Sequence, residues 1–155
     1  MSDAQQTSDA SAWHRKFAAA CNNRAWELSV QDRGPAEDRE MLNAAHASAW
    51  HWSQVGSELN RMRATMLLAE VHALLGFAQS ALAYAAEMRE YFLRVGAPEW
   101  ETAFVHVIHA HSAAAAGARE QHISSYELAT AALAAIQDEE ERSIVAKTFG
   151  HVPAP

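Results

Sequence analysis

The sequence predicts an all-α protein, and three observations lead to that fold class. Apolar residues recur with helical periodicity through most of the 155-residue chain. Alanine is frequent, whereas glycine and β-branched residues are scarce, which favours helix over strand. The first five glycines, at positions 34, 56, 76, 96 and 117, are 22, 20, 20 and 21 residues apart, as regularly spaced helix ends would be.

The first helical hairpin is expected over residues 11–56, after a disordered tail at 1–10. Its turn should lie at Gly34-Pro35, because glycine tolerates a helix stop and proline suits a helix start. The apolar face of its first helix comprises Phe17, Cys21, Ala25 and Leu28. The apolar face of its second helix comprises Leu42, Ala45, Ala49 and Trp52.

The middle hairpin is expected over residues 57–96, with Ser57 as its N-cap and Gly76 at its turn. Its first helix is apolar nearly all round, which predicts burial on more than one side. The third hairpin is expected over 97–136. A short capping helix should follow at 138–149, and residues 151–155 form a tail.

Asp138 and Glu141 have the spacing of a capping box, which predicts that this capping helix begins at Asp138. One continuous helix over residues 119–149 is the alternative that the sequence leaves open.

A period near 40 residues appears when Gly34, Gly76 and Gly117 are set in register, with offsets of 42 and 41. The sequence then resembles the tetratricopeptide-repeat superfamily over residues 57–130. The middle-hairpin residues that carry the resemblance are Leu68, Ala69, Gly76 and Ala81. Those in the third hairpin are Ala110, Gly117, Tyr126 and Ala129. Thr65 and Glu27 depart from the family pattern.

The resemblance implies about three antiparallel hairpins stacked in a right-handed superhelix, with a concave face that binds a protein or peptide partner. Mapped onto this chain, the partner-binding residues on that face are Arg24, Leu28, Arg63, Met66, Glu70 and His111. Simple packing or solvation of each is the alternative reading.

Trp50 and His51 are interface candidates from their composition alone. Trp52 continues a buried face, and Trp50 lies roughly 200° round the helix from it, so one of the two tryptophans should face outward. An outward tryptophan beside histidine is typical of an interface hot spot. We expect a homodimer, because the ends of a three-hairpin stack expose apolar surface.

Nine histidines suggest metal chemistry as an alternative function, a histidine-dependent metalloprotein or metalloenzyme on a helical bundle. His106 and His109 share a helix face and could share a metal ion. Neither Glu-x-x-His nor His-Glu-x-x-His occurs, so we predict no metal site, no cofactor and no catalytic residue. A small-molecule sensor with a pocket near Trp50 and Trp100 is a second alternative.

The composition of the chain disfavours some classes of binding partner. A formal charge of −7 disfavours nucleic acid and anionic membranes, both of which attract basic surfaces. Cys21 is the only cysteine, which fits a reducing cytoplasm and an inert core thiol. The sequence therefore predicts a cytoplasmic, non-catalytic scaffold for protein interactions.

Overall fold

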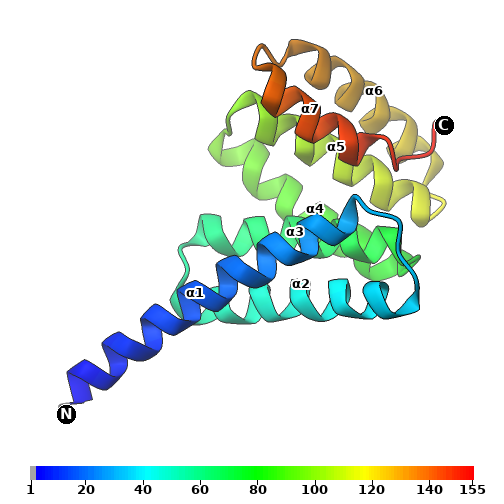
Figure 1. Cartoon of the computed structure of the whole chain (residues 1–155). Coiled ribbons are helices and arrows are strands. Elements are labelled where there is room, and N and C mark those ends of the chain that lie inside the picture. Colours follow the sequence, from blue (N-terminus) through cyan, green and yellow to red (C-terminus); the bar gives the residue numbers. More distant parts are fainter. Residues whose placement is uncertain (1–2) are drawn as a thin grey trace. The chain divides into compact units, whose positions relative to one another are not determined.

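The computed structural model describes residues 3–155, with side chains from Asp9 onward, and this part of the chain forms helices without any strand (Figure 1). The helices are α1 (Asp3–Ser29), α2 (Pro35–Val55), α3 (Glu58–Leu74), α4 (Ala78–Val95), α5 (Glu99–Ala115), α6 (Arg119–Ala135) and α7 (Glu139–Phe149). The all-α prediction is confirmed.

The chain divides into two compact units. The first unit ends at Leu68 and the second begins at Ala69, within α3. Helix α1 begins at Asp3, inside the stretch expected to be a tail. Residues 1 and 2 of that expected tail lie outside the described residues.

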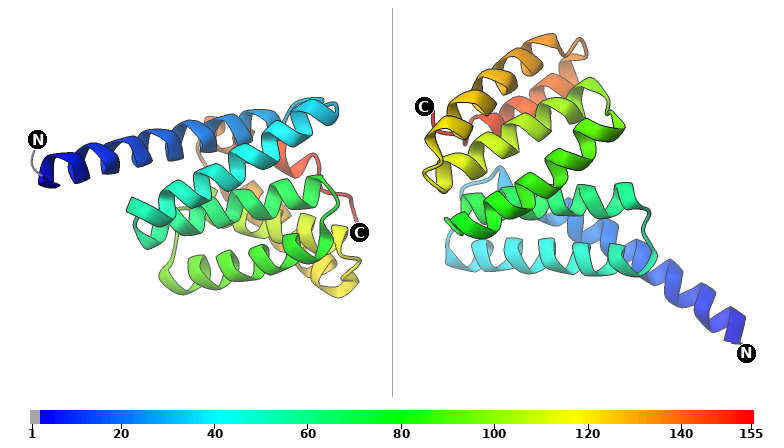
Figure 2. Two further views of the ribbon diagram at one scale, coloured as in Figure 1. Left: turned by 90° about the horizontal axis from the view of Figure 1, so that it is seen from below. Right: turned by 180° about the vertical axis from the view of Figure 1, so that it is seen from behind.

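The first unit is built on an antiparallel hairpin in which α1 and α2 lie side by side (Figures 1 and 2). The buried apolar residues of this hairpin are Ala18, Ala25, Leu28, Met41 and Ala45. Small residues let the two helices approach closely, and the buried Ser48 hydroxyl donates to the Ala18 carbonyl oxygen at 2.9 Å. The N-terminal turns of α1 continue past the end of α2.

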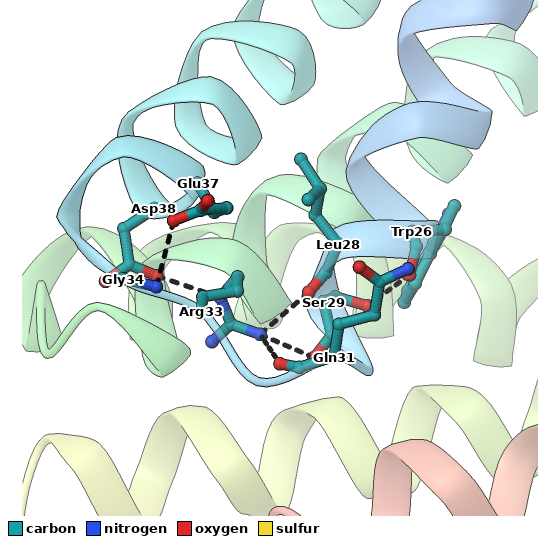
Figure 3. A network of polar contacts seen from close by, with 8 residues as sticks. All are labelled: Trp26, Leu28, Ser29, Gln31, Arg33, Gly34, Glu37 and Asp38. Atoms are coloured by element: carbon teal, nitrogen blue, oxygen red, sulfur yellow. Dashed lines mark hydrogen bonds and ion pairs between the residues drawn. The ribbon is translucent and has the colours of Figure 1, made fainter.

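The turn of this hairpin is held by Arg33, whose side chain is mostly buried (Figure 3). One guanidinium nitrogen, Nη1, donates to the carbonyl oxygens of Leu28, Ser29 and Gln31 at 2.8–3.0 Å. These carbonyls belong to the end of α1 and the residues after it, where helical partners run out. The Nε atom reaches Asp38 in the first turn of α2 at 2.8 Å, so one side chain ties both helices together.

Helix starts follow the expected capping chemistry. The Ser57 hydroxyl accepts from the Asn60 backbone N–H at 3.2 Å, and the Asn60 amide oxygen accepts from the Ser57 N–H at 3.1 Å. Asp138 accepts from the Glu141 N–H at 2.9 Å. Helix α6 ends at Ala135 and α7 begins after this cap, so the continuous-helix alternative is wrong.

The second unit is organised round α5, against which α4, α6 and α7 pack. Twelve of its 17 residues are buried, so α5 is a core helix rather than an amphipathic surface helix. Five of these buried residues are polar: Glu101, His106, His109, His111 and Ser112. Polar groups at this depth require specific partners, which makes α5 the chemically unusual helix of this unit.

Two helix ends in the second unit share one turn. Gly76 and Gly117 have φ values of +74° and +66°, a conformation that only glycine adopts without strain. In both, the next residue's N–H bonds back five residues, Phe77 to His72 and Ala118 to Ala113. The two turns are the same Schellman motif 41 residues apart, in the register that the sequence predicted.

Candidate functional site

Five rings gather on the surface of the α1–α2 hairpin, and we call them the Trp-His patch: Trp13, His14, Phe17, Trp50 and His51. Three of them are large apolar side chains that remain exposed, Trp13 at 53%, Phe17 at 45% and Trp50 at 56%. Water-exposed rings in this number, within one cluster, are a feature that a folded monomer usually avoids.

Helix geometry explains how the patch forms. Trp13 and Phe17 are four residues apart on α1, one turn above each other, and their rings stack at a centroid distance of 5.5 Å. The centroid of the His51 ring lies 5.6 Å from that of Phe17 and 4.9 Å from that of Trp50. His51 therefore contacts the rings of both helices. Phe17 was predicted to be buried with Ala25 and Leu28; that prediction is wrong, because Phe17 packs along the surface instead.

The centre of the patch is a direct contact between two imidazoles. The Nδ1 atoms of His14 and His51 are 2.9 Å apart, and both rings are half-buried. A hydrogen bond at this distance needs one Nδ1 to donate and the other to accept, so at least one ring is neutral. The two Nδ1 atoms therefore share one hydrogen, which lies between them.

Cationic groups border the patch. The Lys16 ammonium lies 4.7 Å from the centre of the Trp13 ring, in cation–π range. Arg15 reaches the Val55 carbonyl oxygen, the end of α2, at 3.4 Å. Because the whole chain carries −7, these residues give the patch a local charge opposite to the protein's net charge.

A four-residue repeat marks the patch in the sequence. Ser-Ala-Trp-His occurs at residues 11–14 and again at 48–51. The antiparallel hairpin brings the two copies together so that each histidine meets the other. The sequence reasoning proposed Trp50 and His51 as interface candidates but not Trp13, His14 or Phe17. This repeat is the signal that could have identified Trp13 and His14, whereas Phe17 lies outside it.

Arg24, a predicted partner-binding residue, lies about two turns beyond Phe17 along the same side of α1. Its guanidinium donates to both Glu40 oxygens at 2.6 and 3.2 Å and lies 3.2 Å from Glu27. The hydrogen bonds from Arg24 lower the pKa of the Glu40 carboxyl. An open groove of about 610 Å³, lined largely by alanines and Cys21, runs beside this ion pair. The charge of Arg24 is thus already neutralised within its own hairpin.

The other predicted concave-face residues are less accessible. Leu28 and Met66 are buried, and Arg63 is half-buried. Glu70 and His111 are brought together, as a shared face requires, but in the interior of the second unit. The His111 Nδ1 atom lies 3.0 and 3.1 Å from the two Glu70 carboxylate oxygens.

His106 and His109, the predicted metal-sharing pair, are both buried on α5. Burial lowers the pKa of each ring, and the nearby Arg89 charge lowers it further; the pKa of His109 falls to about 4. The His109 Nδ1 atom is 2.7 Å from the Ser125 hydroxyl. Within residues 3–155, no three His, Cys, Asp or Glu side chains are grouped as metal ligands.

Comparisons with protein-family models, with curated proteins and with solved structures found no match. The resemblance to the tetratricopeptide-repeat superfamily therefore depends on the residues of this chain alone. In the described part of the chain, no helix is both long and apolar enough to cross a membrane.

Proposed function

We propose that this protein is a non-catalytic interaction module of tetratricopeptide-like type, which binds a partner protein through the Trp-His patch. The observation that carries the proposal is the exposure of Trp13, Phe17 and Trp50, each about half accessible in one cluster. Tryptophan is enriched among the residues that dominate binding energy, because a rigid ring covers much area at little entropic cost.

Features of the second unit support the tetratricopeptide-like part of this proposal. The small residues that the family places where paired helices touch, Ala69, Ala81, Ala110 and Ala129, are all fully buried. The Schellman turns at Gly76 and Gly117 keep the repeat register. Both features are expected of hairpins repeated along a solenoid.

The chemistry of the patch indicates its partner. Apolar rings require apolar side chains opposite them, and Arg15 and Lys16 attract carboxylates. The partner we propose is a segment of another protein that presents an apolar residue flanked by aspartate or glutamate. A second copy of this chain would bring like charges together at the patch, which disfavours it.

Affinity capture from the native host, with quantitative mass spectrometry, tests the proposal. The wild-type chain is compared with Trp50→Ala and Phe17→Ala, and with Ile144→Ala on α7 as a control whose exposure, 50%, lies between those of the two patch residues. Loss of a hot-spot ring costs about 2 kcal/mol, so a true partner should bind roughly 30-fold more weakly to either patch variant.

The decisive comparison is between the two patch variants and the control. A partner recovered equally by wild type and Ile144→Ala, but lost with both patch variants, supports the proposal. Recovery that is identical in all four samples overturns it. Light scattering at tens of micromolar identifies self-association, and a dimer abolished by Trp50→Ala would replace the heterologous partner with a second copy.

A further inference from the structure

We propose that His14 and His51 form a two-histidine binding site for a divalent transition-metal ion of the copper(II) class. The geometry that carries the inference is the approach of the two Nδ1 atoms to 2.9 Å from adjacent antiparallel helices. This site is independent of the partner proposed above, because it requires only the two imidazoles and water.

The separation of the two nitrogens selects the coordination geometry. With metal–nitrogen bonds of roughly 2.0–2.1 Å, two ligands 2.9 Å apart subtend about 90° at the metal. That is the angle between neighbouring ligands in a square-planar or octahedral complex. A tetrahedral zinc site needs roughly 3.3 Å between its nitrogens, so the observed spacing favours copper(II) or nickel(II) over zinc.

Imidazole nitrogen suits these metals, and affinity for a given nitrogen site peaks at copper(II) among the divalent first-row ions. The metal would take the place of the hydrogen now shared between the two Nδ1 atoms, so each ring must carry its hydrogen on Nε2 instead. Two neutral rings reach that state by a tautomer change without releasing a proton, whereas a pair with one protonated ring releases one proton on binding. No electron transfer or bond cleavage in the protein is involved.

Local electrostatics both favour and oppose a cation here. His51 lies in the last turns of α2, where the helix dipole places partial negative charge. Arg15 and Lys16 oppose a metal, but Arg15 is turned to the Val55 carbonyl and Lys16 to the Trp13 ring. Because two ligands leave at least two coordination positions open, water completes the complex.

Trp50 supplies a built-in reporter. Its ring centroid lies 4.9 Å from His51 and 5.4 Å from His14, within the contact range at which copper(II) quenches tryptophan fluorescence. Titration of the tag-free chain with copper(II) at pH 7.5, in a non-chelating buffer, should give saturable quenching with one ion per chain. Electron paramagnetic resonance of the complex should show two equivalent imidazole nitrogens.

The variants His14→Ala and His51→Ala should each bind copper(II) at least tenfold more weakly than wild type. His151→Ala is the matched control, because His151 is exposed at the far end of the chain and should leave binding unchanged. Zinc should bind wild type at least tenfold more weakly than copper(II) does.

Circular dichroism of each variant checks that the helices persist, as expected for half-buried surface rings. Copper(II) binding that survives in either patch variant, or that falls equally in His151→Ala, overturns the proposal. A complex with fewer than two nitrogen ligands overturns it as well, whatever its affinity.

Discussion

Glu70 and His111 are 41 residues apart in the chain, yet their side chains meet inside the second unit, with Nδ1 3.0 Å from a carboxylate oxygen. The Glu70 side chain is almost fully buried, at 1% exposure. A buried carboxylate is costly unless it is paired, and here the imidazole N–H donates to it from α5. The pair therefore fixes the end of α3 against the core helix.

Removing one member of this pair should destabilise the protein much more than replacing both with apolar residues. We expect Glu70→Ala or His111→Ala to lower the free energy of unfolding by about 3–5 kcal/mol, because a polar group is left buried alone. The double variant Glu70→Met with His111→Leu should recover most of that loss, since no unpaired group remains. Urea denaturation measures all three.

The exposed Glu87→Ala on α4 serves as the control and should change stability little. If Glu70→Ala were as mild as Glu87→Ala, the pair would contribute nothing to the fold. Single and double losses that add up would likewise show that the two side chains do not interact.

His109 should make stability depend on pH. Its folded-state pKa is about 4, below the ordinary value of 6.5, because burial and then the Arg89 charge oppose protonation. As pH falls from 6.5 to 4, the unfolded chain takes up a proton that the folded chain refuses, so folding is progressively disfavoured. Above pH 6.5 the ring is neutral in both states and has no effect.

Between pH 7 and pH 4, protonation of His109 in the unfolded chain should lower the free energy of unfolding by about 2 kcal/mol, after allowance for solvent screening. His109→Gln keeps a polar partner for Ser125 and should flatten the stability–pH curve by that amount. His151→Gln, an exposed control, should leave the curve unchanged. A curve for His109→Gln that runs parallel to wild type contradicts the prediction.

Much of the helical layout could be predicted, because its signals are local. Gly76 and Gly117 each end a helix because glycine adopts a positive φ readily. Asp138 begins one because its side chain accepts a single capping hydrogen bond. Both signals involve residues within one turn of each other, so a linear reading detects them. The Glu70–His111 contact was anticipated only as a shared face, not as a buried pair.

The Trp-His patch could be predicted only in part, because it is non-local. Periodicity places Phe17 on the apolar face of α1, but it does not say that α2 leaves this turn uncovered. Likewise the Ser-Ala-Trp-His repeat marks His14 in the sequence, but only the hairpin brings His51 to it. Such a contact depends on how two helices are set against each other, which periodicity does not fix.

Arg33 should be the most sensitive position in the loop between α1 and α2. Arg33→Ala removes three hydrogen bonds to carbonyls at and just after the end of α1, together with the bond to Asp38. We expect it to lower the free energy of unfolding by about 2 kcal/mol. Arg39→Ala, at an exposed position on α2, removes an equal charge and should cost little. Thermal unfolding of both variants measures the difference. Equal melting temperatures would mean that the Arg33 contacts do not stabilise the turn.

Two glycine-to-alanine substitutions should move stability in opposite directions. At Gly117 a Cβ would meet no atom within 4 Å, so alanine there is opposed only by the backbone strain of a φ of +66°. That strain should lower the free energy of unfolding by about 1–2 kcal/mol. At Gly150, φ is −60° and the nearest atom is 3.4 Å away, so alanine fits the existing backbone. Because alanine restricts the unfolded chain, Gly150→Ala should stabilise by about 0.5–1 kcal/mol. Chemical denaturation of the pair measures the signs. A Gly117→Ala variant as stable as wild type would contradict the backbone explanation for the turn after α5, and a destabilised Gly150→Ala would contradict the expected gain there.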